Sequence, residues 1–300
     1  MNKNKIRSIK TAAKGYAFIG INLIGVLIFW TIPLIFSFII SISKWDYSKG
    51  IKGIKLTGLS NYIEMWKDEW FRASLINNII FTISFVLILV VLSFVVAYVL
   101  NEYVVGKKIV QLGLYLPYIV NIVAISAVWL ALFSNNGPVI SFLKKVGIEN
   151  PPVFIADLHW ALPTIVLICV WQNLGYTVIL FLSGMVNIPK DLYEAAAIDG
   201  AGAVTQFFKI TIPMLTPTVF FVMITSIISG FQVFDTVYMM VGKANPAYES
   251  TQTVVMLFYR QAFDYGHKGY AAAISILIFL AIMLVTVIQM IGQKKWVNYD

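Results

Sequence analysis

Residues 194–202, with the sequence EAAAIDGAG, form a polar island between two long apolar segments. Glu194 and Asp199 supply two carboxylates, Gly200 interrupts the run, and the other positions are mostly small. The island ends at Ile210-Thr211-Ile212-Pro213. Because small residues allow another backbone to approach closely, we interpret this stretch as a docking element for another protein.

The rest of the chain indicates a membrane protein. Of its 300 residues 59% are hydrophobic and only 12% are charged, whereas about a quarter are charged in a soluble domain. Six apolar runs are each long enough, as helices, to cross about 30 Å of hydrocarbon, and the alternation of membrane strands is absent. We predict an all-α, polytopic membrane protein with six transmembrane helices in a single domain. The domain covers residues 1–300, and its expected spans are about 16–43, 75–100, 109–133, 162–186, 212–241 and 270–291.

Charge at the two ends predicts the orientation. Six spans place both termini on one side, and Lys3, Lys5 and Arg7 with Lys294 and Lys295 favour the cytoplasm. Lys and Arg are divided about evenly between the two sides, but they are denser in the shorter inner segments. The first apolar run is too long for a signal peptide and has no cleavage site. A composition rich in Ile, Lys and Asn suggests a bacterium, so we expect a multi-pass protein of a bacterial cell membrane, both termini cytoplasmic.

The segments between spans differ in character. Residues 44–74 contain three tryptophans, which suits an interfacial helix, and 134–161 and 242–269 carry turn signals. In the inner segment, Pro189 fits a first helical turn, and Gly200 and Gly202 interrupt the helix. We therefore expect a helix, a glycine break and a short helix before Pro213. Candidate kinks inside or near spans are Pro33, Pro117 and Pro217.

A search for chemistry finds no reactive set. The chain has no G-x-x-x-x-G-K-[ST] loop, no H-E-x-x-H and no paired cysteines. Cys169, the single cysteine, fits a small apolar packing residue, and His159 and His267 lie in proposed outer loops. We expect no catalytic residue, no metal site and no cofactor in this chain. The net charge of +8 is the basic fringe usual in membrane proteins, so we expect no nucleic-acid partner.

The island resembles the EAA loop of the permease subunits of binding-protein-dependent ABC importers. That loop reads E-A-A, three residues, glycine, nine residues and I-x-L-P. Here Glu194-Ala195-Ala196 is followed by Gly200 and then by 210–213, with isoleucine where leucine is usual. Residues 56–62 (LTGLSNY), 187–193 (NIPKDLY) and 231–238 (FQVFDTVY) resemble segments of the carbohydrate branch, which includes the maltose-type permeases.

The resemblance implies a type I ABC importer permease fold with a cytoplasmic coupling helix in the loop at about 187–213. It implies a second homologous permease, two ATPase subunits that bind ATP and Mg, and an extracellular or lipid-anchored solute-binding protein. The expected substrate is a carbohydrate: a mono- or oligosaccharide, a polyol or glycerol phosphate. The residues implied in ATPase coupling are Glu194, Ala195, Ala196, Asp199 and Gly200.

Polar and aromatic residues within spans are candidates for the substrate path. Polar groups in lipid face a bundle interior or a cavity, and rings with amides suit sugars. The candidates are Asn121, Trp129, Gln172, Asn173, Tyr176, Gln232, Asp235 and Tyr238, together with Ser126 and Trp171. Alternatively, the rings form interfacial belts and the amides join helices. Asp235 is the strongest candidate because a buried carboxylate needs a reason, although it could instead brace the partner permease.

Other functions remain open at this point. Importers of peptides, amino acids or phosphate also carry EAA loops. A secondary transporter or channel without an ATPase usually has inverted repeats or several charges within spans, and here only Asp235 qualifies. A membrane scaffold that transports nothing is a third reading. The sequence does not identify the solute.

Overall fold

The structure is a computed structural model that describes residues 15–16 and 19–298. The chain forms two compact units, 1–67 with 258–277 and 68–257 with 278–300, which are described separately. Lys3, Lys5 and Arg7, on which the predicted orientation partly rests, lie outside the described residues. Helices α14 (Val254–Tyr259) and α15 (Lys268–Gly292) each run from one unit into the other.

The first unit begins with an apolar helical run, Ile19–Ser41, that is long enough to cross a membrane. A β-hairpin and a short helix follow it. The elements are η1 (Leu27–Thr31), α2 (Ile32–Ser41), β1 (Ser43–Trp45), η2 (Tyr47–Gly53), β2 (Ile54–Leu56), α3 (Ser60–Lys67) and η5 (Arg260–Asp264).

The hairpin corrects the interfacial helix expected over 44–74. Strands β1 and β2 pair antiparallel, with Ser43 opposite Leu56. A Cβ on Gly53 would lie 2.0 Å from the carbonyl oxygen of Asp46, so the hairpin closes only because this residue is glycine. After the hairpin, the segment contains the short helix α3 and the first residues of α4, and Trp66 on α3 is exposed.

The LTGLSNY segment has a structural role in this unit. Asn61 is 3% exposed, and its Nδ2 donates to the carbonyl oxygens of Ser41 (2.8 Å) and Ser43 (2.9 Å). The hydroxyl of Tyr62 donates to Ser41 Oγ at 2.9 Å. These hydrogen bonds satisfy carbonyls where α2 ends, which a helix cannot do for its own last turn.

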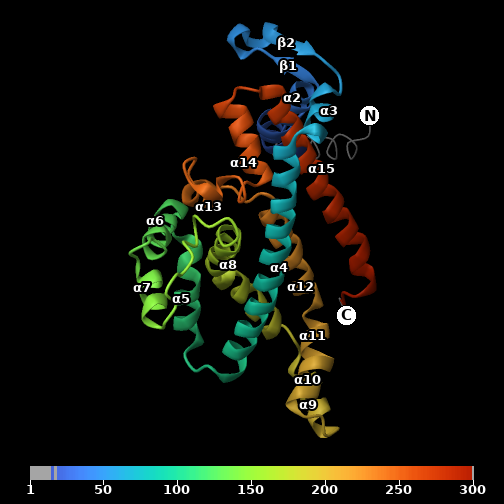
Figure 1. The fold of residues 1–300 in the computed structure, drawn as a ribbon. Helices are drawn as coiled ribbons and strands as arrows, with labels where there is room; N and C mark the ends of the chain where they lie inside the picture. Colours follow the sequence, from blue (N-terminus) through green and yellow to red (C-terminus); the bar gives the residue numbers. More distant parts are fainter. Residues whose placement is uncertain (1–14, 17–18, 299–300) are drawn as a thin grey trace, which may run out of the picture. The chain divides into compact units, whose positions relative to one another are not determined.

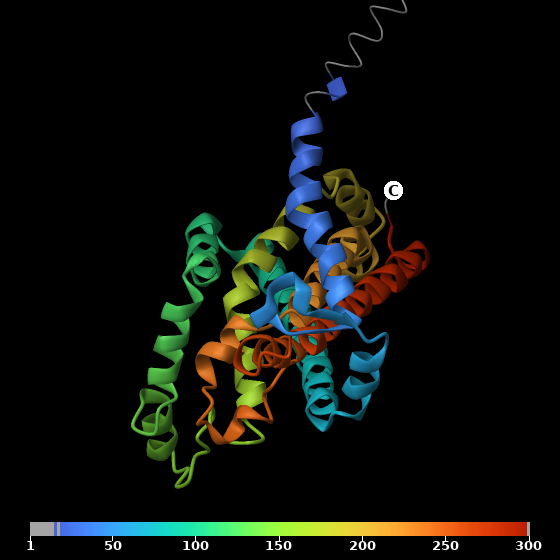
Figure 2. The same cartoon turned by 90° about the horizontal axis from the view of Figure 1, so that it is seen from above.

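The second unit is a helical bundle in which α4, α8 and α12 run beside one another (Figure 1). The two green helices α5 and α6 follow one another along one side of it (Figure 2). Its elements are α4 (Glu69–Tyr103), α5 (Lys107–Ile119), α6 (Ile122–Leu132), α7 (Pro138–Lys145), α8 (Ala161–Val186), α9 (Lys190–Ile198), α10 (Ala203–Gln206), η3 (Phe207–Thr211), α11 (Ile212–Met214), α12 (Thr216–Phe231), α13 (Asp235–Met240), η4 (Pro246–Tyr248) and η6 (Gln293–Lys295).

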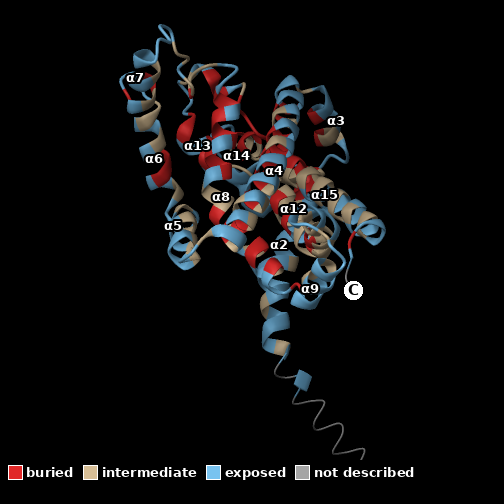
Figure 3. Cartoon of the chain, turned by 90° about the horizontal axis from the view of Figure 1, so that it is seen from below, coloured by how far each residue is buried: buried red, intermediate tan, exposed pale blue. Residues whose placement is uncertain are grey.

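Helices α4 and α8 form the frame of this unit, because both contribute to each of its two apolar clusters. One cluster joins Phe85 and Ile165 to Val237 of α13, and the other joins Phe181 to Val222 of α12. Many residues of α8 are buried, as Figure 3 shows in red, whereas α5 has no buried residue.

The six predicted spans correspond to four long apolar helices and two bent pairs. The helical membrane fold is confirmed, and the third and fifth spans are broken close to the candidate kinks at Pro117 and Pro217. The third bends by 96° between α5 and α6, where Val120 is extended and Asn121 caps α6. The fifth bends by 58° before α12 and ends at Phe231 rather than near 241.

Close backbone contact between α5 and α8 depends on Gly175. A Cβ at this position would lie 1.9 Å from the carbonyl oxygen of Leu114. We expect Gly175→Ala to lower the free energy of unfolding by about 1–3 kcal/mol, because the two backbones must separate. Equilibrium unfolding in detergent, followed by tryptophan fluorescence, measures this change.

The matched control is Gly113→Ala on α5, where an added Cβ meets nothing within 4 Å. We expect its free energy of unfolding to stay the same or to rise by up to about 1 kcal/mol, because alanine favours a helix interior over glycine. Equal losses in both variants would contradict the close contact at Gly175.

Candidate functional site

The polar island folds into an elbow, by which we mean residues 187–213. Helix α9 ends at Ile198 with Asp199 as its C-cap, and Gly200 follows with a φ of +78°, a conformation that L side chains rarely adopt. The N–H of Gly200 donates to the carbonyl oxygen of Ala197 (3.1 Å) and that of Ala201 to Ala196 (2.8 Å). This is a Schellman end to α9, so the predicted glycine break is a left-handed turn.

A second set of contacts holds the two arms of the elbow together. The hydroxyls of Tyr193 on α9 and Thr211 on η3 lie 2.9 Å apart in a hydrogen bond. Gln206 Nε2 donates to the carbonyl oxygen of Ala201 at 3.0 Å. The π-helix η3 ends at Thr211, two residues before Pro213, whose missing N–H and bulk disfavour a regular α-turn there.

The outer surface of the elbow is exposed and unusually apolar at its tip. Ile198 is 87% and Val204 72% exposed, and Glu194, Ala195 and Asp199 are also exposed. Helix α9 begins at Lys190, and its N-cap residue, Pro189, makes no side-chain cap hydrogen bond. The elbow therefore presents small, apolar and acidic groups together, a surface suited to a protein partner.

A cavity of about 310 Å³ lies in the second unit among α4, α6, α8 and the end of α12. We call it the amide cavity, because Gln172, Asn173 and Gln232 line it together with the carboxylate of Asp235. Four predicted path residues thus meet at one place. Its other lining residues are Phe81, Phe85, Ile122, Cys169, Ser229, Val233, Phe234 and Thr236.

Asp235 differs from the prediction, since its side chain is exposed in this chain rather than buried. The helix breaks after Phe231, so the carboxylate heads the short helix α13 instead of sitting within a span. There it lies in the first turn of α13, where a negative charge is favourable.

The six remaining candidates lie outside the amide cavity; Ser126 is buried in α6, and the other five are Asn121, Trp129, Trp171, Tyr176 and Tyr238. Asn121 accepts a hydrogen bond from the N–H of Val123 (2.8 Å) and caps α6. Trp129 packs edge to face on Trp171, with ring centroids 5.3 Å apart. The other two rings are stacked, Tyr176 on Tyr118 at 4.7 Å and Tyr238 on Phe234 at 5.1 Å.

A buried amide network, which the sequence analysis missed, holds the broken end of α12 in place. Asn78 is fully buried; its Nδ2 donates to the carbonyl oxygen of Gly230 (3.3 Å), and its Oδ1 accepts from the N–H of Val254 (3.1 Å). The hydroxyl of Thr253 donates to the carbonyl oxygen of Val233 at 3.0 Å. The signal available in the sequence was an amide side chain inside the second span.

Comparison with known proteins agrees with this geometry. The family model for the inner membrane component of binding-protein-dependent transport systems matches residues 90–297. The chain belongs to this family. The range includes α8, the elbow and α12, and membership confirms the predicted resemblance to importer permeases.

Two relatives match the permease over nearly its full length. It is 34% identical over 299 residues to the probable ABC transporter permease protein YesP of Bacillus subtilis (strain 168), covering 99% of this chain and 96% of that protein. It is 30% identical over 289 residues to the lactose transport system permease protein LacF of Rhizobium radiobacter, covering 94% of each.

A solved structure shares the fold of the permease. The crystal structure of a bacterial ABC transporter involved in the import of the acidic polysaccharide alginate matches with a TM-score of 0.86. The match covers 99% of this chain and 100% of that one, at 20% identity. The expected importer permease fold is therefore confirmed. Among the described residues of this permease, no group of His, Cys, Asp or Glu is placed to hold a metal ion.

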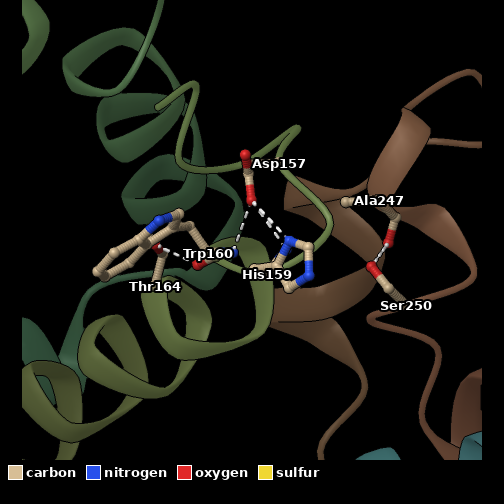
Figure 4. Close-up of polar contacts among 6 residues, drawn as sticks. All are labelled: Asp157, His159, Trp160, Thr164, Ala247 and Ser250. Carbon is tan, nitrogen blue, oxygen red and sulfur yellow. Dashed lines mark hydrogen bonds and ion pairs between the residues drawn. The ribbon is translucent and has the colours of Figure 1, made fainter. Parts of the chain in front are cut away.

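The start of α8, a helix that carries three residues of the amide cavity, is fixed by Asp157 (Figure 4). Its Oδ1 accepts from the N–H groups of His159 (2.8 Å) and Trp160 (3.1 Å). These backbone hydrogen bonds hold the pKa of Asp157 below its usual value near 3.8. The His159 imidazole, 3.9 Å away and 92% exposed, contributes little.

The charged cap should make the stability of the permease depend on pH. Folding lowers the pKa of Asp157, so its ionised carboxylate stabilises the folded state fully at pH values above the ordinary pKa of an aspartate, near 3.8. This stabilisation is lost as the pH falls through the lowered pKa of the folded state. We expect wild type to be more stable than Asp157→Asn at pH 6, with the difference shrinking toward pH 3. Unfolding in detergent across this pH range measures the difference.

The control for this experiment is Glu149→Gln, in the same outer segment and at no helix start. We expect a smaller difference that lacks this pH dependence. If both variants lose the same pH-dependent stability, the cap is not its source.

Proposed function

We propose that this permease is one subunit of an ATP-driven importer for carbohydrates and that its elbow docks onto a separate ATPase subunit. The observation that carries the coupling role is the exposed surface of the elbow around Glu194, Ala195 and Ile198, held by the left-handed turn at Gly200. Glu194 offers a charge to a basic group of the partner, and the alanines allow close approach. ATP and Mg belong to the ATPase, and this chain does no covalent chemistry.

The elbow is built to transmit a displacement. Its arms are joined by the Tyr193–Thr211 hydrogen bond, so a push on α9 reaches η3 and α11 rather than being absorbed at the glycine turn. The 58° bend at Leu215 then leads into α12, whose far end at Phe231 borders the amide cavity. We infer that movement of the docked ATPases alters the cavity through α12.

The chemistry of the amide cavity supports a carbohydrate substrate. Amides and hydroxyls hydrogen-bond sugar hydroxyls, and Phe81 and Phe85 supply apolar rings for C–H faces. Relatives of this chain are described as permeases for lactose, arabinooligosaccharides and sn-glycerol-3-phosphate. We propose that Gln172, Asn173, Gln232 and Asp235 contact the solute.

The full importer requires further subunits. We propose a second, homologous permease completing the path, two ATPases and an external solute-binding protein that delivers the sugar. Because an ATPase acts from the cytoplasm, the elbow faces inward and both termini are cytoplasmic.

The coupling role is tested by Gly200→Pro in the reconstituted complex. Proline cannot adopt a φ of +78° and lacks the N–H that bonds to Ala197, so the elbow is misfolded. We expect ATP-dependent uptake to fall at least about tenfold. A tenfold loss corresponds to about 1.4 kcal/mol, which is less than the roughly 3 kcal/mol that a badly placed proline costs the folded backbone. Proteoliposome uptake and subunit co-purification are measured together.

The control is Gly202→Ala, whose φ is −71° and where a Cβ meets nothing within 4 Å. We expect near-normal uptake from it. Intact assembly and uptake in Gly200→Pro would rule out the elbow as the coupler.

The cavity role is tested by Gln172→Ala, Gln232→Ala and Asp235→Asn. Loss of one hydrogen bond to a neutral hydroxyl is worth about 0.5–1.5 kcal/mol, so we expect KM for uptake to rise about 2- to 13-fold per variant. Uptake is measured with a panel of mono- and oligosaccharides, polyols, amino acids and peptides.

Asn150→Ala, in an exposed outer loop, is the matched amide control and should leave KM unchanged. Unchanged KM in all three cavity variants would remove the cavity from the path. Uptake of an amino acid or peptide, with none of any carbohydrate, would instead reassign the substrate.

A further inference from the structure

A second cavity, of about 570 Å³, lies in the second unit behind the elbow and shares no residue with the amide cavity. We call it the basal cavity. The ends of α4 and α8, the start of α5 and the inner side of the elbow form its walls. Its lining residues are Tyr98, Asn101, Glu102, Lys107, Met185, Val186, Ile188, Lys190, Tyr193, Ala203, Gln206, Phe207 and Thr211.

The charges of the basal cavity are unbalanced. Lys107 and Lys190 face a single carboxylate, Glu102, among the lining residues. Glu102 accepts from Asn101 Nδ2 at 2.9 Å, and Lys107 Nζ donates to Asn101 Oδ1 at 3.3 Å. Among the described residues, no carboxylate oxygen lies within 4.0 Å of the Nζ of either lysine. The cavity thus offers two ammonium groups to an anion.

The rest of the lining suits a polyhydroxy body beside that anion. Tyr98 and Phe207 pack with centroids 4.6 Å apart and present aromatic surface. Gln206, Tyr193 and Thr211 bring amide and hydroxyl groups to the same space. Its volume lies within the range of about 300–1,000 Å³ usual for small-molecule sites.

We propose that the basal cavity binds a soluble phosphate ester of a sugar or polyol from the cytoplasm. Lys107 and Lys190 hold the phosphate, and the aromatic and amide groups hold the carbon skeleton. The inference rests on the proposed cytoplasmic placement of the elbow. A lipid headgroup shares the phosphate chemistry, but the polar groups that line the cavity favour a soluble ester with several hydroxyls.

Occupation of this cavity would act on transport. Lys190 opens α9 of the elbow and Lys107 opens α5, so one phosphate held by both lysines ties the elbow to α5. The Tyr193–Thr211 pair that joins the arms of the elbow lies in the same wall. A ligand that prefers one elbow position slows the transport cycle. The phosphate ester is therefore a feedback inhibitor of uptake.

The test uses the purified complex in phosphatidylcholine nanodiscs with saturating nucleotide. Glucose 6-phosphate and glycerol 3-phosphate are titrated against glucose and sulfate while the unfolding temperature is followed. We expect a saturable rise in Tm with an ester, a smaller rise with sulfate and none with glucose. In Lys107→Met/Lys190→Met the apparent Kd should rise at least tenfold.

Two further variants keep the test independent of folding. Lys108→Met removes an exposed neighbouring charge that does not line the cavity, and it should bind like wild type. Lys107→Arg/Lys190→Arg keeps both charges and should stay within about threefold of the wild-type Kd, in keeping with its preserved pairing to phosphate. A separate uptake experiment places the ester on the ATPase side of the membrane. Uptake with the ester, divided by uptake without it, should be at most about one half in wild type and close to one in Lys107→Met/Lys190→Met.

The outcomes separate this inference from the proposed function. No rise in Tm in wild type, an equal rise in the methionine pair, or a rise only in phosphatidylglycerol nanodiscs would each overturn the site. Carbohydrate uptake that no ester inhibits would reject the feedback role alone. Absence of any carbohydrate uptake would reject the proposed function, while the binding titration would still decide the cavity.

Discussion

A chain surrounded by lipid must satisfy its own backbone N–H and C=O groups, because hydrocarbon offers them no partner. In the second unit this constraint explains where polar side chains hydrogen-bond to the backbone. The helix breaks that shape the amide cavity each leave backbone groups without helical partners. Asn121 caps the break between α5 and α6, and Asn78 and Thr253 bind the carbonyls of Gly230 and Val233 where α12 ends. The break at the end of α12 contacts the buried side chain of Asn78, whereas Val120 and Asn121 at the α5–α6 break are exposed in this chain.

The two ends of α12 in the second unit are held by different contacts. Helices α4 and α8 pack into both apolar clusters, so they give a fixed frame against which α12 is held at one end by buried amides and at the other by the elbow. Gly230 sits so close to α4 that a Cβ would lie 2.9 Å from the Cγ2 of Thr82. Close glycine contacts and polar ties therefore localise movement to bends, which suits a protein that must change shape without exposing backbone.

The sequence predicted what depends on local pattern. Apolar runs of sufficient length indicated the spans, and the spacing around Gly200 indicated a glycine break because few other residues tolerate its left-handed φ. The family followed from the same spacing. The meeting of Gln172 and Asn173 with Gln232 and Asp235 was only partly predictable: the residue types were identified as candidates, but nothing in the sequence placed them together.

The remainder depends on contacts between distant residues. Asn78 bonds to the N–H of Val254, 176 positions away, and Gln252 bonds to Ser74, 178 positions away. Periodicity carries no information about such partners. The hairpin at 43–56 was missed because tryptophans mark an interface without specifying helix or strand. Asp235 was taken as buried because the apolar run was assumed to be one helix, and a break at Gln232 changes its surroundings completely.

The single cysteine has a practical consequence. Cys169 lines the amide cavity and is 5% exposed, and no other thiol exists in the 300 residues. The wild-type permease is thus already a single-cysteine protein with its label site beside the candidate substrate groups. Because the thiol is buried, a maleimide reaches it only as the cavity opens, so the rate of modification reports on that opening without any engineered substitution, and slower modification with a solute present reports occupancy.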